Sequence, residues 1–330
     1  MKKIRVGIIG LGRIAALYEE DNRAKKYYPC LTHAGSYRRD PRIELVCGAD
    51  IDRKRVRKFK DRFGVARVYT DHKKMLAENE IDILSICTYP DNHYRIIKDA
   101  LPYVKVIFCE KPFTRGSGEI KKIIALQEAA GARIAIDLYR QYDVSHRKVR
   151  EMLLSGRFGA IDRINCYYGK GLRNMGSHML GYIMSVVGKP VVIRTLQKYS
   201  YKGVGEYTYD VYLEFKGKVP VVLQSCDYDN YRLFEIDMIC SKGRVQILDE
   251  GLTIRHSSVR KNRAETGAFE LFQVKEAAST IGSALGGAVD HLVSLKEDPG
   301  ATPLFSPKEY LQLQYVIEEI ERQGRRLGRV

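Results

Sequence analysis

The first 138 residues alternate between short apolar runs and segments with helical spacing. The apolar runs occupy residues 3–9, 43–49, 81–87, 105–110 and 133–138. They lack the alternation of a half-buried strand, which is typical of parallel strands covered on both faces. The helical segments occupy residues 52–63, 71–79, 93–101 and 117–130. This order predicts one doubly wound α/β domain over residues 1–138.

The pattern changes after residue 138. A helix is predicted over residues 145–155 and a long closing helix from Ser306-Pro307, where Glu309 completes a capping box. Between them, strands with mixed alternation are predicted at residues 161–168, 191–202, 206–215, 219–229, 232–240 and 243–248. Residues 139–330 are therefore expected to form an α+β domain with a large, mostly antiparallel open sheet.

A glycine turn follows the first predicted strand. Its sequence is Gly10-Leu11-Gly12-Arg13-Ile14-Ala15, a Gly-x-Gly-x-x-Ala pattern that is expected to open a helix. The first glycine permits the tight turn, and the second lets the backbone approach a pyrophosphate near the helix end. The position of the turn after a strand predicts dinucleotide binding by Gly10, Gly12, Arg13 and Ile14.

The second strand ends at Asp50, which is the position that receives the adenosine ribose. A carboxylate there repels a 2′-phosphate and favours NAD, while Arg53 and Lys54 leave NADP open as the less favoured alternative. Residues 19–42 lengthen the segment before this strand, and a helix is predicted from Thr32. We interpret His33 in this segment as a packing or surface residue, with ligand contact as the alternative.

Polar residues follow two further predicted strands. Thr88, Pro90 and His93 come after residues 81–87, and Glu110-Lys111-Pro112 come after residues 105–110. Because ligands bind outside the carboxyl ends of strands in open α/β sheets, Lys111 is expected at a ligand. His93 fits either a packing residue at a helix start or a direct ligand.

In this order and at these spacings, Gly10-x-Gly12, Asp50, Thr88-x-Pro90-x-x-His93 and Glu110-Lys111-Pro112 resemble the glucose-fructose oxidoreductase/inositol dehydrogenase/rhizopine catabolism (Gfo/Idh/MocA) family. The resemblance covers essentially the whole chain, including residues 140–159 and 171–188. Residues 29–35 resemble a subset of the family with an extended first loop. The resemblance implies cofactor contacts at Thr88, Pro90, His93, Glu110 and Lys111, and a homodimer or homotetramer.

The stretch 171–180 resembles the second catalytic motif of that family, Asp-x-x-x-His, with Asn174 in place of the aspartate. The four-residue spacing puts Asn174 and His178 on one face of a helical turn. The aspartate that often follows the histidine by three residues in the family is Gly181 here, which removes a carboxylate that could hold His178.

The resemblance implies hydride transfer between nicotinamide and a secondary alcohol or ketone of a sugar, cyclitol or nucleotide sugar. His178 is then the general base, Lys111 stabilises charge on the substrate oxygen, and Asn174 orients the substrate. The changes at Asn174 and Gly181 leave a non-catalytic NAD-binding sensor or regulatory protein as the alternative function.

Composition narrows the remaining classes. The chain has 330 residues and a net charge of +16, and the basic cluster at residues 53–60 has the spacing of a solvated helix face. Without a nucleic-acid motif or a long apolar stretch, neither nucleic acid nor membrane is expected as a partner, and the charge favours an anionic small molecule. Seven cysteines without Cys-x-x-Cys spacing indicate buried thiols in the cytoplasm and no metal site.

Overall fold

The computed structural model describes residues 2–328, which form two compact units. The first unit holds the chain up to Asp143 together with Gly282–Leu311. The second unit holds Val144–Ile281 and the chain after Leu311. The sequence placed the boundary after residue 138 and assigned all that follows to one domain.

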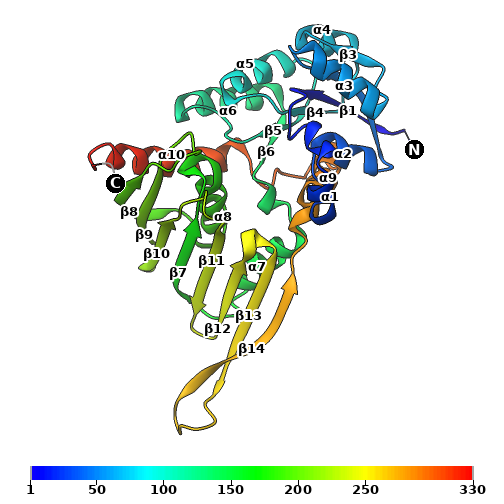
Figure 1. The fold of residues 1–330 in the computed structure, drawn as a ribbon. Helices are drawn as coiled ribbons and strands as arrows, with labels where there is room; N and C mark the ends of the chain where they lie inside the picture. Colours follow the sequence, from blue (N-terminus) through cyan, green and yellow to red (C-terminus); the bar gives the residue numbers. More distant parts are fainter. Residues whose placement is uncertain (1, 329–330) are drawn as a thin grey trace. The chain divides into compact units, whose positions relative to one another are not determined.

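The first unit contains a six-stranded parallel sheet in the order β3-β2-β1-β4-β5-β6 (Figure 1). Its strands are β1 (Ile4–Ile9), β2 (Ile43–Ala49), β3 (Arg67–Tyr69), β4 (Ile83–Ile86), β5 (Val106–Glu110) and β6 (Arg133–Asp137). The strand order reverses between β1 and β4, so their carboxyl ends border the crevice where this fold binds ligands. The connecting helices are α3 (Arg53–Phe63), α4 (His72–Glu78), α5 (Pro90–Ala100) and α6 (Ser117–Ala130). The predicted doubly wound fold is confirmed.

The glycine turn does not lead directly into an α-helix, and the expectation that it would is wrong. An irregular turn and the 3₁₀-helix η1 (Leu17–Glu20) follow it, then the short helix α1 (Asn22–Tyr27). The carbonyls of Ile14 and Ala15 accept hydrogen bonds from the backbone of His33 (3.2 Å) and Ala34 (2.9 Å) at the start of α2 (His33–Arg39). Those carbonyls are therefore unavailable to a regular helix.

The segment Gly282–Leu311 belongs to the first unit because of its apolar face. The 3₁₀-helix η5 (Ile281–Ser283) leads into α9 (Ala284–Glu297), which lies beside α2 (Figure 1). Residues spaced three and four apart on α9, including Ala288, Val289 and Leu292, are buried in the core that also contains Val6 of β1. An amphipathic helix packs where its apolar face is covered, whatever its place in the sequence.

The second unit is built on an eight-stranded sheet in the order β14-β13-β12-β11-β7-β10-β9-β8. Its strands are β7 (Ile161–Tyr168), β8 (Pro190–Tyr199), β9 (Thr208–Phe215), β10 (Val219–Ser225), β11 (Phe234–Cys240), β12 (Gly243–Leu248), β13 (Thr253–Lys261) and β14 (Phe269–Ala278). Only the β7–β10 pair is parallel, so the predicted mostly antiparallel sheet is confirmed. Strands β13 and β14, a hairpin at one edge in Figure 1, were not predicted.

Further helical segments lie outside the two sheets. They are η2 (Tyr139–Gln141) in the first unit, and α7 (Val144–Leu154), η3 (Gly171–Gly176), α8 (Ser177–Val187) and η4 (Asp249–Gly251) in the second. The closing helix α10 (Pro307–Gly324) starts with the predicted capping box, in which the Ser306 backbone donates to Glu309 Oε2 at 3.0 Å. Among the described residues, no helix is long and apolar enough to cross a membrane.

Candidate functional site

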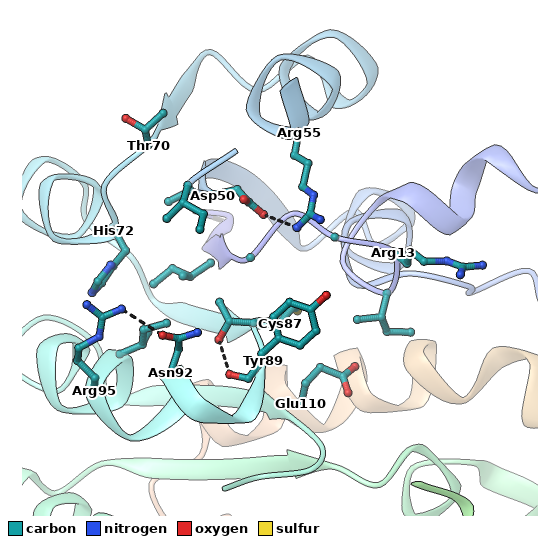
Figure 2. Close-up of a pocket in the computed structure, with 18 of the residues that line it drawn as sticks. Arg13, Asp50, Arg55, Thr70, His72, Cys87, Tyr89, Asn92, Arg95 and Glu110 are labelled. Carbon is teal, nitrogen blue, oxygen red and sulfur yellow. Dashed lines mark hydrogen bonds and ion pairs between the residues drawn. The ribbon is translucent and has the colours of Figure 1, made fainter. Parts of the chain in front are cut away.

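A cavity of about 480 Å³ lies at the carboxyl ends of β1, β2, β4 and β5 in the first unit. This volume is in the range of small-molecule and cofactor sites. Eight predicted site residues line the cavity: Gly10, Gly12, Arg13, Ile14, Asp50, Thr88, Glu110 and Lys111. Figure 2 shows Asp50 beside Arg55 at one part of this cavity and Glu110 at another. Residues separated by 100 positions in the sequence thus share one cavity.

The two glycines of the turn are required for different reasons. Gly10 has a φ of 87°, and a Cβ there would lie 2.7 Å from the Cys87 carbonyl carbon. A Cβ on Gly12 would meet nothing closer than Arg55 Nη1 at 3.9 Å. Gly10 is therefore needed to pack the turn against the strand ends, whereas Gly12 leaves open space where a ligand can approach the backbone.

Alanine at these two positions is expected to give opposite results. Gly10→Ala should lower the free energy of unfolding by about 1–3 kcal/mol or more, because of its positive φ and its backbone clash. Gly12→Ala should leave the unfolding midpoint unchanged and weaken NAD binding by about tenfold or more, about 1.4 kcal/mol. Thermal unfolding and calorimetric titration with NAD test both. Normal NAD affinity in a well-folded Gly12→Ala variant would contradict the role assigned to Gly12.

Asp50 connects the end of β2 to the glycine turn. Its Oδ2 accepts from the Leu11 backbone at 2.7 Å, and its Oδ1 accepts from the Asp52 backbone at 2.8 Å. The Arg55 guanidinium lies 3.5 Å from Asp50 Oδ2. Figure 2 shows the two side chains pointing toward each other. Asp50 is 7% exposed and still lines the cavity, so its carboxylate can also meet a ligand.

Cationic and ring side chains line much of the same cavity. Arg13, Arg55, His72 and Arg95 contribute to its wall, and the Arg13 guanidinium lies 4.5 Å from the Tyr18 ring centroid. Only Asp50 and Glu110 add carboxylates to this wall. Such a cavity suits an anionic ligand with a ribose end, which is the chemistry of a dinucleotide. The glycine backbone, the carboxylate and the cations present therefore fit NAD.

His93 and Pro90 do not line the cavity. Pro90 is the first residue of α5 and His93 is fully buried in the same helix. The His93 ring nitrogens lie 2.9 Å from the carbonyl oxygens of Phe113 and Thr88. Burial lowers the pKa of His93, although both carbonyls raise it. His93 thus fastens the turn after β4 to the segment after β5.

The Glu110 side chain links the cavity to a buried polar cluster. Its Oε2 accepts from the Lys111 backbone at 3.1 Å, and its Oε1 lies 3.1 Å from His33 Nε2. The same His33 nitrogen lies 3.5 Å from Asp137 Oδ2, and His33 Nδ1 lies 3.2 Å from Ser85 Oγ. His33 is 1% exposed, so it is a buried partner of two carboxylates.

This cluster was not predicted from the sequence, in which His33 is interpreted as a packing or surface residue and Asp137 has no assigned role. One signal was available: Asp137 ends β6 as Glu110 ends β5, and the two are register partners in the sheet. Two acidic residues at the ends of adjacent buried strands require a group that compensates their charge. His33 is that group, but its approach depends on the path of residues 19–42, which the sequence alone does not reveal.

The protonation of the cluster follows from its burial and charges. Burial opposes a charge on His33, but Cys87, Asp137 and Glu110 together raise its pKa well above 6.5. Burial raises the pKa of the Cys87 thiol above 9.0, so at pH 7 the thiol is neutral and only the two carboxyl groups can carry a negative charge beside His33. Burial and the Glu110 charge raise the pKa of Asp137 to about 7. Burial also opposes ionisation of Glu110, but His33 and then Lys111 lower its pKa below 4.5.

In the second unit, Asn174 and His178 lie on consecutive helical segments. Asn174 is in the π-helical turn η3, and His178 is the second residue of α8 and 2% exposed. Glu206 holds this turn, because its two carboxylate oxygens accept the backbone N–H groups of Arg173 (2.7 Å) and Asn174 (2.9 Å). Both Asn174 and His178 therefore lie in helical structure, as their four-residue spacing predicts.

Gly171 leaves the space in which the Glu206 side chain forms its hydrogen bonds with the turn. It has a φ of 88°, and a Cβ there would lie within 2.5 Å of three Glu206 side-chain atoms. Arg173 also forms an ion pair of 2.7 Å with Glu321 on α10. Sequence reasoning identified Asn174 and His178 but missed Glu206, because no local pattern connects residue 206 with the turn at residue 171.

Part of the chain is similar to a known family of oxidoreductases. The GFO_IDH_MocA family model, described as an oxidoreductase family with an NAD-binding Rossmann fold, matches residues 4–138. Myo-inositol 2-dehydrogenase of Thermotoga maritima is 24% identical over 156 residues, which are 47% of this chain. The matched stretch spans 42% of the length of that relative.

Solved structures resemble the chain over nearly its whole length. An oxidoreductase from Agrobacterium radiobacter, in complex with NAD⁺, L-tartaric acid and magnesium, has a TM-score of 0.77 and 15% identity, covering 98% of this chain and 97% of the other. A mutant of a 3-ketoreductase from Actinomadura kijaniata, in complex with TDP-benzene and NADP, has a TM-score of 0.74 and 14% identity, covering 98% of each chain. At these identities the likeness shows the fold. The likeness to the Gfo/Idh/MocA oxidoreductase family is thus shown for residues 4–138, the part of the chain that the family model matches.

Proposed function

We propose that the chain is an NAD-dependent dehydrogenase or reductase that acts on a secondary alcohol or ketone of a sugar, cyclitol or nucleotide sugar. One observation carries the proposal: Lys111 and Glu110 line the same cavity as the glycine turn and Asp50. Inositol 2-dehydrogenases among the relatives support the substrate class. The net charge of +16 adds support for an anionic substrate.

The roles of the residues follow from their chemistry. Gly10, Gly12 and Asp50 would hold the cofactor, which supplies the hydride acceptor or donor when bound. Lys111 donates a hydrogen bond to the substrate oxygen and stabilises the charge that develops on it. His178 accepts the hydroxyl proton in the oxidation direction, and Asn174 orients the substrate through its amide. The roles of His178, Asn174 and Lys111 rest on the family resemblance.

A panel of polyols, sugars, sugar phosphates and nucleotide sugars tests the proposal. Each compound is incubated with the chain and NAD or NADP, and absorbance at the nicotinamide wavelength reports reduction; ketones with NADH or NADPH cover the reverse direction. We expect turnover with at least one cyclic polyol or sugar derivative. Tight NAD binding together with no turnover across the panel would contradict the proposed activity.

We propose that NAD is preferred to NADP because of the Asp50 charge. Asp50→Asn keeps an acceptor for the Leu11 backbone and removes the negative charge. It should lower the preference for NAD over NADP by about 10–100-fold, corresponding to about 1.4–2.8 kcal/mol. The matched double variant Asp50→Asn/Arg55→Met should bind NADP less well than Asp50→Asn, because Arg55 is the nearest cation to the lost carboxylate. Dissociation constants for both cofactors give the answer, and an unchanged ratio in Asp50→Asn would contradict this preference.

A further inference from the structure

The sheet itself places two carboxyl groups side by side under the cavity. Glu110 and Asp137 are register partners at the carboxyl ends of the parallel strands β5 and β6. They are 8% and 3% exposed. Two ionised carboxylates on neighbouring strands, away from water, repel each other strongly. Such a pair binds a proton more tightly than either carboxylate would alone. This placement therefore requires a positive charge or a shared proton.

His33 meets that requirement from a third element. The helix α2 brings its Nε2 to 3.1 Å from Glu110 Oε1 and 3.5 Å from Asp137 Oδ2. Its Nδ1 lies 3.2 Å from Ser85 Oγ, which is 2.6 Å from the Tyr37 hydroxyl. Both ring nitrogens of His33 thus have partners.

The Asp137 carboxyl group has one oxygen left over. Its Oδ1 is buried, and among the residues that the structure describes none forms a hydrogen bond with it. Leaving an ionised oxygen buried in this way costs free energy, whereas a carboxyl group that shares a proton carries less charge there. This observation is independent of the distances around His33 and also indicates a proton held within the cluster.

We propose that His33, Glu110 and Asp137 hold one shared proton, so that the cluster carries a single negative charge and presents it beside Lys111 through Glu110. The inference rests on the proposed function, in which Lys111 acts on the substrate oxygen. His33 and Asp137 do not line the cavity. They are positioning residues that act through Glu110, whose Oε2 accepts from the Lys111 backbone.

The charge is the same in either arrangement of the proton. An imidazolium with two carboxylates has a net charge of −1, and so has a neutral imidazole with one carboxylate and one carboxylic acid. The groups that face His33 are Tyr37 on its own helix, Ser85 on β4, Cys87 after β4, Glu110 on β5 and Asp137 on β6. Together with the Lys111 ammonium the cluster has no net charge, so the attraction between its groups offsets part of the cost of burying them.

Nitrogen-15 NMR of histidine-labelled protein measures the shared proton directly. The His33 signal is assigned by its absence in His33→Asn. We expect His33 in the unmodified chain to show no neutral-imidazole transition between pH 6 and 8. Asp137→Asn removes one anion and should move the His33 transition to lower pH. A His33 signal that titrates near pH 6.5 in both proteins would overturn the proposal.

A double-mutant cycle in unfolding separates charge from packing. His33→Asn leaves two buried carboxyl groups without a cation and should unfold at a lower denaturant concentration than the unmodified chain. Asp137→Asn destabilises the unmodified chain but should raise the midpoint of His33→Asn, because a single carboxylate then remains. The part-exposed pair His72–Asp99, 2.9 Å apart, is the matched control and should show nearly additive effects. A double variant at His33 and Asp137 no more stable than His33→Asn would overturn the proposal.

The pH dependence of stability has a defined sign. The raised pKa of His33 means that the folded chain keeps a proton that the unfolded chain releases above about pH 6.5. Its stabilisation is fully present below pH 6.5 and is lost as the pH rises through the folded-state pKa. The unfolding midpoint should therefore decline over this range in the unmodified chain, and this decline should be absent in the double variant. A decline of equal size in both would overturn the proposal.

Two further measurements complete the test. The three side chains could each offer a ligand atom to a metal, all within 4.8 Å, so stoichiometric metal in the purified chain would overturn the shared proton. With the best substrate of the panel, His33→Asn should lower kcat by about tenfold or more, with partial recovery in the double variant and unchanged NAD affinity.

The NMR and unfolding measurements need no substrate, so the two proposals can fail separately. A panel without turnover rejects the proposed function but leaves the test of the shared proton intact. Additive unfolding effects reject the shared proton but leave the test of the function intact.

Discussion

Replacing Lys111 by methionine is expected to lower kcat by about 10²–10³-fold, because it removes the charged donor that we propose for the reacting oxygen. Methionine keeps much of the length of the side chain and removes the ammonium. Lys111 lines the cavity directly after β5, together with Glu110, whose charge it partly balances. NAD affinity should change little, since we propose that the glycine turn and Asp50 make most of the cofactor contacts. Initial rates with the best substrate of the panel and a direct NAD titration measure the two effects separately.

Lys105 provides the control for this variant. It precedes the same strand at its opposite end, and its Nζ donates to the carbonyls of Leu101 and Ala130. Lys105→Met should leave kcat unchanged even where it lowers the unfolding midpoint. If Lys111→Met keeps full activity, or if both variants lose activity to the same extent, Lys111 has no specific part in the reaction.

The first unit was predicted well because most of its strands, β1, β4, β5 and β6, are buried on both faces. A strand such as Ile83–Ile86 has no exposed position, so its apolar run marks it without any knowledge of its neighbours. The strand ends then place Gly10, Asp50 and Lys111 at one edge of the sheet, whatever the details of the loops. Local sequence was sufficient because the topology of the fold determines which strand ends lie next to one another.

Sequence failed where distant segments decide local structure. The turn after Gly12 loses its helix because His33 and Ala34 occupy the carbonyls that a helix would use. The hairpin β13–β14 was missed because polar and charged residues, such as Arg255 and Glu276, face each other across it as an ion pair and dilute the apolar alternation. In each case the competing interaction joins residues that are about 20 positions apart.

The buried cluster illustrates the same limit at the site. The pairing of Glu110 with Asp137 depends on the register of β5 and β6, and the approach of His33 depends on the path of residues 19–42. A motif comparison points to Glu110-Lys111-Pro112 but not to the residues that compensate its charge. The motif therefore marks Lys111, which we propose acts on the substrate oxygen, whereas the residues that compensate the charge of Glu110 are found only in the structure.

Replacing His178 by glutamine is expected to lower kcat for alcohol oxidation by about 10²–10⁴-fold, the usual contribution of a positioned general base. Glutamine can still form hydrogen bonds from the start of α8 but cannot take up the hydroxyl proton. The effect should be large because Asn174, four residues before His178, has an amide side chain that cannot take up the proton in place of the lost base. Steady-state rates over a range of pH, with NAD affinity measured in parallel, test this expectation.

His256 in the same unit supplies the matched control. It is 8% exposed on β13 and packs against the Phe158 ring. His256→Gln should keep both kcat and the shape of the pH–rate profile, even where it lowers the unfolding midpoint. Added imidazole should restore part of the activity to His178→Ala, which a packing role would not produce. Because Glu206 positions the backbone of the turn before α8, full activity in His178→Gln would move the search for the base to other groups held by that turn.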